Sequence, residues 1–331
     1  MTLFATTSFD DTSMSRPRTS GRLIPLANAD AQLQKAKRKA NRRADLTSLC
    51  FLLPILAVFV GLCAVPMGET IYFSFTDFNG YSMDLNWVGV QNYREAFSDP
   101  SLLQSLSFTI AYAVFVTLFV TILAVPLAVI LNKRFFGSNF ARSLFFFFSV
   151  PSLAIMGMVW KYIFSPLKSG AANSVLSWFG IKPLPWLADS NLAQICVIFV
   201  AVWAQIGWHA TLYLAYLQSI PADLYEQATV DGANAFQQFT HITLPQLVPG
   251  IVISTFLLMS NGLKVYDLPF TLTKGGPGFA TYTVTQSIIV RGIGQSDYGV
   301  GSALAVLFML ATAVMVFLQL GASQIVARRF Q

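Results

Sequence analysis

The stretch DLYEQATVDG, Asp223–Gly232, begins a polar segment that lies between two long apolar runs of the chain. Asp223 and Glu226 have the spacing of a capping box, in which an N-cap side chain and the third helical residue satisfy each other's backbone amides. A helix is therefore expected to begin at Asp223. Gly232 suits its end, because glycine enters the left-handed conformation without a Cβ clash.

The following residues, ANAFQQFTHITLP, repeat this logic up to Pro245. Asn234 and Gln237 again have capping-box spacing, so a second short helix is expected there. Pro245 is expected to end it, because proline has no N–H to donate within a helix. With three carboxylates and no Lys or Arg in 223–245, the segment predicts a helix–turn–helix lying beside a membrane.

The composition is that of an integral membrane protein. The chain has 331 residues, of which 55% are hydrophobic and 11% charged, whereas soluble domains are roughly a quarter charged. The net charge of +6 is concentrated in the N-terminal tail and next to apolar runs, which indicates membrane topology and not a nucleic-acid partner. The three cysteines lie in apolar runs, where they are expected to be packing residues.

The apolar runs predict an all-α, polytopic membrane protein with six transmembrane helices. The expected spans are 46–72, 102–131, 143–164, 192–220, 248–270 and 299–325. Residues 1–45 are expected to be a mostly disordered, basic cytoplasmic tail, and 46–331 a transmembrane domain. Of the 21 Lys and Arg residues, nine lie in the tail, three in the first inner loop and two at the C-terminus, so both termini are expected in the cytoplasm.

The sequence contains no motif of a catalytic or metal site. There is no G-x-x-x-x-G-K-[ST] phosphate loop, no H-E-x-x-H and no nucleophile elbow. The two histidines, His209 and His241, are isolated from each other in the sequence, which does not suggest a metal site. No catalytic residue and no metal ligand is therefore assigned.

The polar segment also carries a family resemblance. Glu226-x-Ala228, then Gly232 and Leu244-Pro245, resemble the EAA loop of permease subunits in binding-protein-dependent ABC importers, although Gln227 stands where that family has alanine. In that family this loop couples the permease to a cytoplasmic ATPase. The resemblance implies a coupling loop at 221–247, with these coupling residues: Glu226, Ala228, Asp231, Gly232, Leu244 and Pro245.

A second resemblance narrows the type of permease. Lys264-Val-Tyr-Asp267 followed by Thr273-x-Gly-Gly-Pro277 is similar to the signature of the F-type permease of sugar importers, with Lys274 in place of a glycine. Asn92-Tyr93 resembles an external segment of the same family. Charges near a span are costly unless they are paired or face water, so an ion pair of Lys264 with Asp267 is favoured over contact with substrate.

The sugar-importing relatives also imply a substrate pocket. Positions counted from the two motifs are Ala201, Gln205, Trp208, Leu258, Asn261, Gly262 and Val265. Each set has helical spacing and shares a helix face. Gln205, Trp208 and Asn261 have the chemistry that sugars need, since amides bond hydroxyl groups and aromatic rings stack on sugar faces. Ordinary helix packing with polar contacts is the rival interpretation at every position.

The resemblance as a whole implies a type I ABC importer permease for a sugar or related polyol, in a bacterial plasma membrane surrounded by lipid. It implies as partners a second, similar permease, two cytoplasmic ATP-binding subunits that hold ATP and magnesium, and an extracytoplasmic solute-binding protein. The chain itself would be neither an enzyme nor a cofactor binder. A secondary transporter is the alternative, but the paired broken helices and intramembrane ion ligands expected of that class are not evident. A membrane enzyme ranks third.

Overall fold

The structure, a computed structural model, describes residues 52–82, 84–133 and 135–330. The predicted tail 1–45 lies outside the described residues. The chain divides into two compact units, Met1–Pro66 and Met67–Gln331. Of the first unit, the structure describes the beginning of the helix Leu52–Phe73, which contains the π-turn η1 (Val60–Ala64) and continues as α2 (Val65–Phe73).

Five helices in the described part of the chain are long and apolar enough to cross a membrane. They are Leu52–Phe73, α4 (Pro100–Asn132), α8 (Ser190–Gln218), Ala235–Leu263 and Tyr298–Gly321. Four of these agree closely with predicted spans, and the fifth predicted span is corrected below. Within residues 52–82, 84–133 and 135–330 no named β-strand is present, apart from the isolated bridge Thr76–Trp87. The all-α prediction is confirmed.

The predicted third span, 143–164, is two helices. α5 (Ser138–Phe147) ends before Pro151, and α6 (Leu153–Ile163) begins after it. Proline cannot donate a helical hydrogen bond, and it disfavours the helical conformation of the residue before it. Ser152 then caps α6 by accepting a hydrogen bond from the Ile155 N–H at 3.4 Å. The six predicted crossings are therefore five long helices and one interrupted segment.

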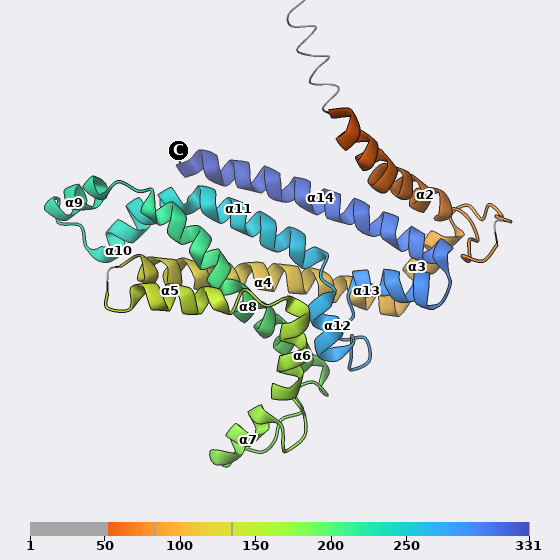
Figure 1. The fold of residues 1–331 in the computed structure, drawn as a ribbon, viewed down its shortest axis with the longest axis horizontal. Coiled ribbons are helices and arrows are strands. Elements are labelled where there is room, and N and C mark those ends of the chain that lie inside the picture. The colour runs from red at the N-terminus through yellow and green to blue at the C-terminus, as the bar shows by residue number, and fades with distance from the viewer. Residues whose placement is uncertain (1–51, 83, 134, 331) are drawn as a thin grey trace, which may run out of the picture. The chain divides into compact units, whose positions relative to one another are not determined.

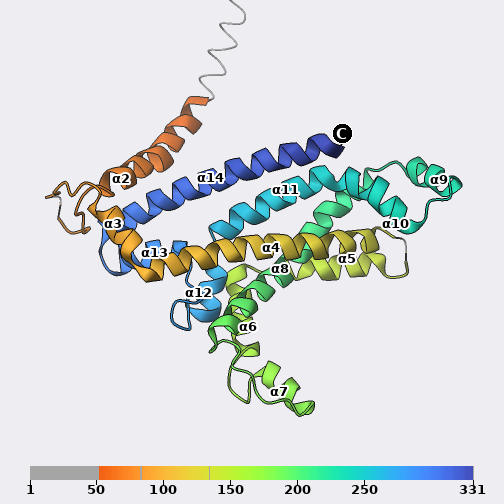
Figure 2. The same cartoon turned by 180° about the vertical axis from the view of Figure 1, so that it is seen from behind.

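α4, α8 and α11 (Leu244–Leu263) enclose the main apolar core of the second unit, and α14 (Tyr298–Phe330) packs along α11 (Figures 1 and 2). Tyr112 of α4 and Tyr213 of α8 are among its largest buried side chains. Lipid tails are as apolar as these side chains, so such a core is held by close packing. Small residues accordingly lie where helices cross: a Cβ on Gly262 of α11 would be 2.9 Å from Cα of Ala113 on α4.

Away from the polar segment 223–245, the second unit has several short helices and turns, with α7 projecting beyond α6 (Figure 1). These elements are α3 (Gln91–Ser98), α7 (Ala171–Trp178), α12 (Asp267–Thr273), α13 (Val284–Ile289) and the π-turn η3 (Val290–Gly294). Residues 278–298, which lie between the last two predicted spans, thus contain the helical stretch 284–294.

Two buried asparagines tie these short elements to their neighbours. The Asn92 amide donates to the Ser74 carbonyl at 3.0 Å and to the Thr76 carbonyl at 2.8 Å, which fastens α3 to the end of α2. Asn173 accepts from the indole N–H of Trp186 at 2.9 Å and from the backbone N–H of Leu184 at 3.0 Å. Asn92 belongs to the external segment identified by resemblance, and both asparagines link neighbouring segments of the chain.

Candidate coupling surface and translocation site

The first helix of the polar segment is α9 (Ala222–Val230). Gly232 follows it with φ +80°, as the predicted left-handed stop requires. The predicted N-cap is wrong: the N-cap is Pro221, two residues before Asp223, and no side chain caps the helix. Asp223 lies instead in the first turn, where a carboxylate is favoured by the unpaired N–H groups and the helix dipole.

The second helix begins as predicted but does not end as predicted. Asn234 and Gln237 form a complete capping box, with bonds of 2.8 and 2.9 Å, at the start of α10 (Ala235–Gln238). The helix then passes through the π-turn η2 (Phe239–Thr243) directly into α11, so that 235–263 is one continuous helix. Pro245 therefore does not terminate it.

The π-turn explains why Pro245 is tolerated. The N–H of Leu244 reaches back five residues to the Phe239 carbonyl, which widens the helix just before the proline ring. Pro245 then occupies one of the first two positions of α11, where its missing N–H has least effect. The same arrangement recurs in the first apolar helix, where η1 immediately precedes α2 and Pro66 is the second residue of α2.

The predicted coupling residues are mainly at the surface of this segment. Glu226, Asp231 and Gly232 are exposed, whereas Ala228, Leu244 and Pro245 are half-buried. The two helices are tied together by a bond of 3.0 Å from the Gln238 amide to the Thr229 hydroxyl. A second contact of 3.0 Å joins the hydroxyl groups of Tyr225 and Thr243.

The segment also has apolar groups that the sequence interpretation missed. Val230 is 88% exposed and Phe236 is 74% exposed, one on each of the two helices. Between the helices lies a cavity of about 370 Å³ with Gly232 and Ala233 in its wall. Exposed apolar side chains on a polar segment are typical of a protein-docking surface. The signal was present in the sequence as two large apolar residues flanking Gly232.

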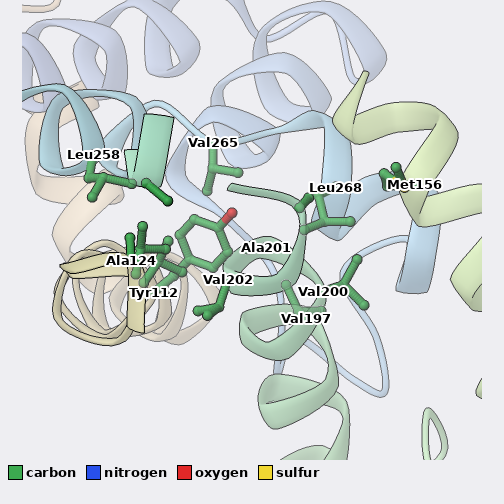
Figure 3. Packing of buried hydrophobic residues seen from close by; sticks show 14 of the residues in the cluster. Tyr112, Ala124, Met156, Val197, Val200, Ala201, Val202, Leu258, Val265 and Leu268 are labelled. Atoms are coloured by element: carbon green, nitrogen blue, oxygen red, sulfur yellow. The ribbon is translucent and has the colours of Figure 1, made fainter. Parts of the chain in front are cut away.

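The predicted pocket positions occupy two environments. Ala201, Leu258 and Val265 are buried in the main core, between α4, α8 and α11 (Figure 3). Gly262 is buried against α4. The polar and aromatic members lie nearer the surface: Trp208 is 42% exposed, Asn261 is exposed and Gln205 is half-buried.

A buried polar group lies next to Trp208 and was not predicted. His209 Nδ1 is 2.7 Å from the Ser254 hydroxyl, and the Tyr213 hydroxyl donates to the same oxygen at 2.7 Å. These bonds tie α8 to α11. The indole of Trp208 packs edge-on to the imidazole of His209, with centroids 4.7 Å apart, so the same contacts hold the indole. The i, i+4 spacing of His209 and Tyr213 was a signal for a shared polar face.

Residues 120–331 match the family described as "Binding-protein-dependent transport system inner membrane component". The chain belongs to this family.

Several permease proteins are similar to this chain over most of their length. A probable starch degradation products transport system permease of Thermoanaerobacterium thermosulfurigenes is 30% identical over 83% of this chain and 92% of its own. A trehalose/maltose transport system permease of Thermococcus litoralis is 32% identical over 85% of this chain and 95% of its own.

The fold is that of a type I ABC importer permease. A subunit of a bacterial ABC transporter that imports the acidic polysaccharide alginate superimposes with a TM-score of 0.76 at 22% identity, over 87% of this chain and 98% of that one. The same subunit, in a complex with a pentasaccharide-bound periplasmic protein, gives the same score. At this identity the likeness establishes the fold of the permease.

The region around Lys264 and Asp267 differs from what the sequence predicted. No ion pair joins Lys264 to Asp267; among the described residues, the ion pairs are those of Arg291. α11 ends at Leu263 and α12 begins at Asp267, so the two charges do not share a helix and the predicted fifth span, 248–270, is interrupted. Within the described ranges, no group of three or more His, Cys, Asp or Glu residues could hold a metal ion.

Proposed function

We propose that this permease is the F-type subunit of an ATP-driven importer for a sugar or a related polyol. It would work in a bacterial plasma membrane, with both termini in the cytoplasm. The observation that carries the proposal is the coupling segment, in which α9 and α10 present exposed Glu226, Val230 and Phe236, and the capped helix α10 continues without a break into α11. A docked subunit could move such a segment as a rigid extension of a membrane helix.

The partners follow from this role. A second permease would complete the translocation path, two ATP-binding subunits would dock on the segments 221–247 of the two permeases, and a solute-binding protein would deliver the substrate outside. ATP and magnesium would bind in the ATPase subunits. Closure of the ATPase pair would favour one orientation of the permeases over the other, in proportion to the difference in nucleotide affinity between the two states.

The substrate class is supported by the relatives, whose names include trehalose, maltose and starch products. In this chain the indole of Trp208 and the amides of Gln205 and Asn261 have the chemistry to bind a sugar, by stacking and by bonding to hydroxyl groups. Ala201, Leu258, Gly262 and Val265 would shape and support that face from behind, since they are buried.

The test is uptake by proteoliposomes that contain the complex assembled from this chain and the ATPase, permease and binding protein encoded beside it. ATP-dependent accumulation of labelled maltose, trehalose or diacetylchitobiose is expected, with none when ATP is omitted. Uptake by this chain alone, driven by an ion gradient, would instead establish a secondary transporter.

The substrate face is tested in the same vesicles. Trp208→Ala and Asn261→Ala are expected to weaken uptake at least tenfold while binding-protein-stimulated ATPase activity is retained, because contacts to substrate are lost and coupling is not. Trp178→Ala is the matched control, since Trp178 is an 80% exposed indole on the outer helix α7. Wild-type uptake by both test variants would mean that these faces serve only packing.

A further inference from the structure

The end of the permease opposite the coupling segment contains a second cavity, of about 510 Å³, whose lining includes both apolar and polar side chains. Its walls come from the start of α4, from the turn before α13 and from η3. Volumes of this order are usual for sites that bind small molecules. None of the substrate-face positions, from Ala201 to Val265, lies in its wall, so it is separate from the site proposed above.

One wall of this cavity is aromatic. The Phe279 ring is 48% exposed, and it meets the Tyr282 ring nearly at a right angle, with centroids 5.3 Å apart. The packing of one ring against the other fixes the orientation of the exposed one. A fixed, exposed ring face beside polar groups is suited to stack on the C–H face of a sugar.

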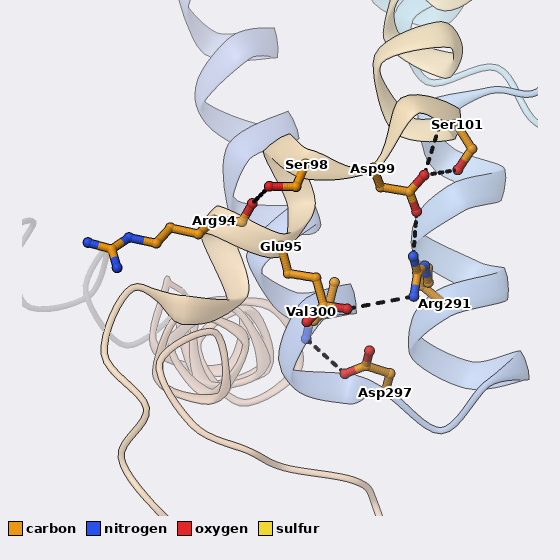
Figure 4. A network of polar contacts seen from close by, with 8 residues as sticks. All are labelled: Arg94, Glu95, Ser98, Asp99, Ser101, Arg291, Asp297 and Val300. Carbon is orange, nitrogen blue, oxygen red and sulfur yellow. Dashed lines mark hydrogen bonds and ion pairs between the residues drawn. The ribbon is translucent and has the colours of Figure 1, made fainter.

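Another part of the wall belongs to a charged network, in which the guanidinium of Arg291 faces carboxylates (Figure 4). Arg291 donates to the Asp99 carboxylate and lies 3.8 Å from the Glu95 carboxylate. Asp99 also accepts bonds from the Ser101 N–H at 2.8 Å and the Ser101 hydroxyl at 2.7 Å, so its position is fixed by three donors. Such preorganised polar groups can bond a ligand without first rearranging.

The charge balance of the network selects the class of ligand. One guanidinium faces the carboxylates of Asp99 and Glu95, and Asp297 adds a third carboxylate close enough to act on Arg291 electrostatically. An anionic ligand would meet net negative charge, and an apolar ligand would remove water from the ion pair without replacing its hydrogen bonds. A neutral polyhydroxyl compound satisfies both conditions.

We propose that this cavity is an outer sugar subsite, in which a neutral sugar ring stacks on Phe279 and its hydroxyl groups bond to the Arg291–Asp99 pair and to the amides of Gln104 and Gln295. The subsite rests on the proposed function, since it would hold a sugar ring at the outer mouth before or during transfer to the membrane face near Trp208.

The test places a fluorophore beside the cavity. Ile293 is 65% exposed and adjoins η3 residues of the wall without belonging to it, so Ile293→Cys, in a variant without Cys50, Cys63 and Cys196, can carry bimane on the assembled complex. Maltose, trehalose and diacetylchitobiose are titrated as neutral probes, and galacturonate as an anionic one. A saturable shift with at least one neutral probe is expected, and none with galacturonate.

Phe279→Ala is expected to lower the affinity for the neutral probe by roughly three- to tenfold, because one stacked ring is lost. Phe279→Tyr keeps the ring and is expected to keep the affinity. Phe97→Ala is the matched control, because Phe97 is an exposed ring at the same end that lines a different, apolar groove. The proposal is overturned if no neutral probe gives a saturable shift, or if Phe279→Ala leaves the shift unchanged. Uptake that persists alongside either result would leave the transport function standing without the subsite.

Discussion

A close crossing of two helices gives a sharp test of the packing. Gly207 of α8 lies against the backbone of α5, and a Cβ added to it would be 1.9 Å from the Phe145 carbonyl oxygen. Ordinary contact begins at 3.4 Å, so Gly207→Ala requires the two helices to separate by about 1.5 Å. The added Cβ would also be 3.0 Å from the Ser149 hydroxyl, which now bonds the backbone N–H of Trp208.

The expected cost follows from two opposing effects. Overpacking usually destabilises by ~1–3 kcal/mol, and the upper part of this range applies because a backbone oxygen cannot rotate away. Replacing glycine by alanine within a helix stabilises the helix by ~1 kcal/mol. The net loss for Gly207→Ala is therefore about 2 kcal/mol, or on the order of 5 °C in the unfolding midpoint of the permease.

The assay is the thermal unfolding of the detergent-solubilised complex, followed by size-exclusion chromatography with fluorescence detection. Gly321→Ala is the matched control, because it makes the same change in another membrane helix where nothing lies within 4 Å of the added atom. If Gly207→Ala unfolds at or above the temperature of Gly321→Ala, α5 and α8 are not in the close contact described here.

Three further predictions concern the two ends of the permease. Cysteines placed at Asn234 and Ser169, in a background without the native ones, should react with an impermeant thiol reagent from opposite sides of the membrane; labelling from one side contradicts the topology. Gly232→Pro should uncouple ATP hydrolysis from uptake without preventing insertion, because it alters the turn, at φ +80°, between the two coupling helices; normal uptake contradicts this. The Asp99–Arg291 pair should stabilise the permease at neutral pH and cease to do so in acid, which thermal unfolding across pH would detect.

The sign of the pH effect follows from the environment of the carboxylate. Partial burial opposes ionisation of Asp99, but hydrogen bonds from Ser101 and Arg291 outweigh it and hold the pKa of this carboxyl below its usual value of 3.8. A lowered pKa contributes stability that is complete above 3.8 and is lost as the pH falls through the folded-state value. Asp99→Asn should remove this part of the pH dependence, and an unchanged profile would count against the pair.

Local signals in the sequence predicted local features well. The Asn234–Gln237 capping box and the left-handed Gly232 depend on residues only a few positions apart, so their spacing was sufficient. The pair Asp99–Arg291 spans 192 residues, and no periodicity could have suggested it. The break after Leu263 was missed because apolar residues resume at Leu268, so the predicted span was extended across the charged turn where the helix ends.

The substrate face shows a different limit. Helical spacing placed Leu258 and Val265 on one helix face, but α11 ends at Leu263 and Val265 lies in the turn beyond it. Both nevertheless pack in one cluster with Ala201. The spacing of residues does not determine whether a helix face lies against a packed core or a cavity, because apolar and small residues are found in both. Their burial is set by the approach of α4, whose Tyr112 belongs to the same cluster.

The helix 235–263 runs without a break from the coupling segment through a membrane span. The π-turn η2 keeps the helix continuous at Pro245. A tilt of the helix at Phe236 would therefore be transmitted along it to Leu263, where the helix ends. The point that bends in response to this tilt is therefore expected in the turn 264–266, between α11 and α12. We expect a movement of Phe236 to reach this turn, at the other end of the membrane-spanning helix.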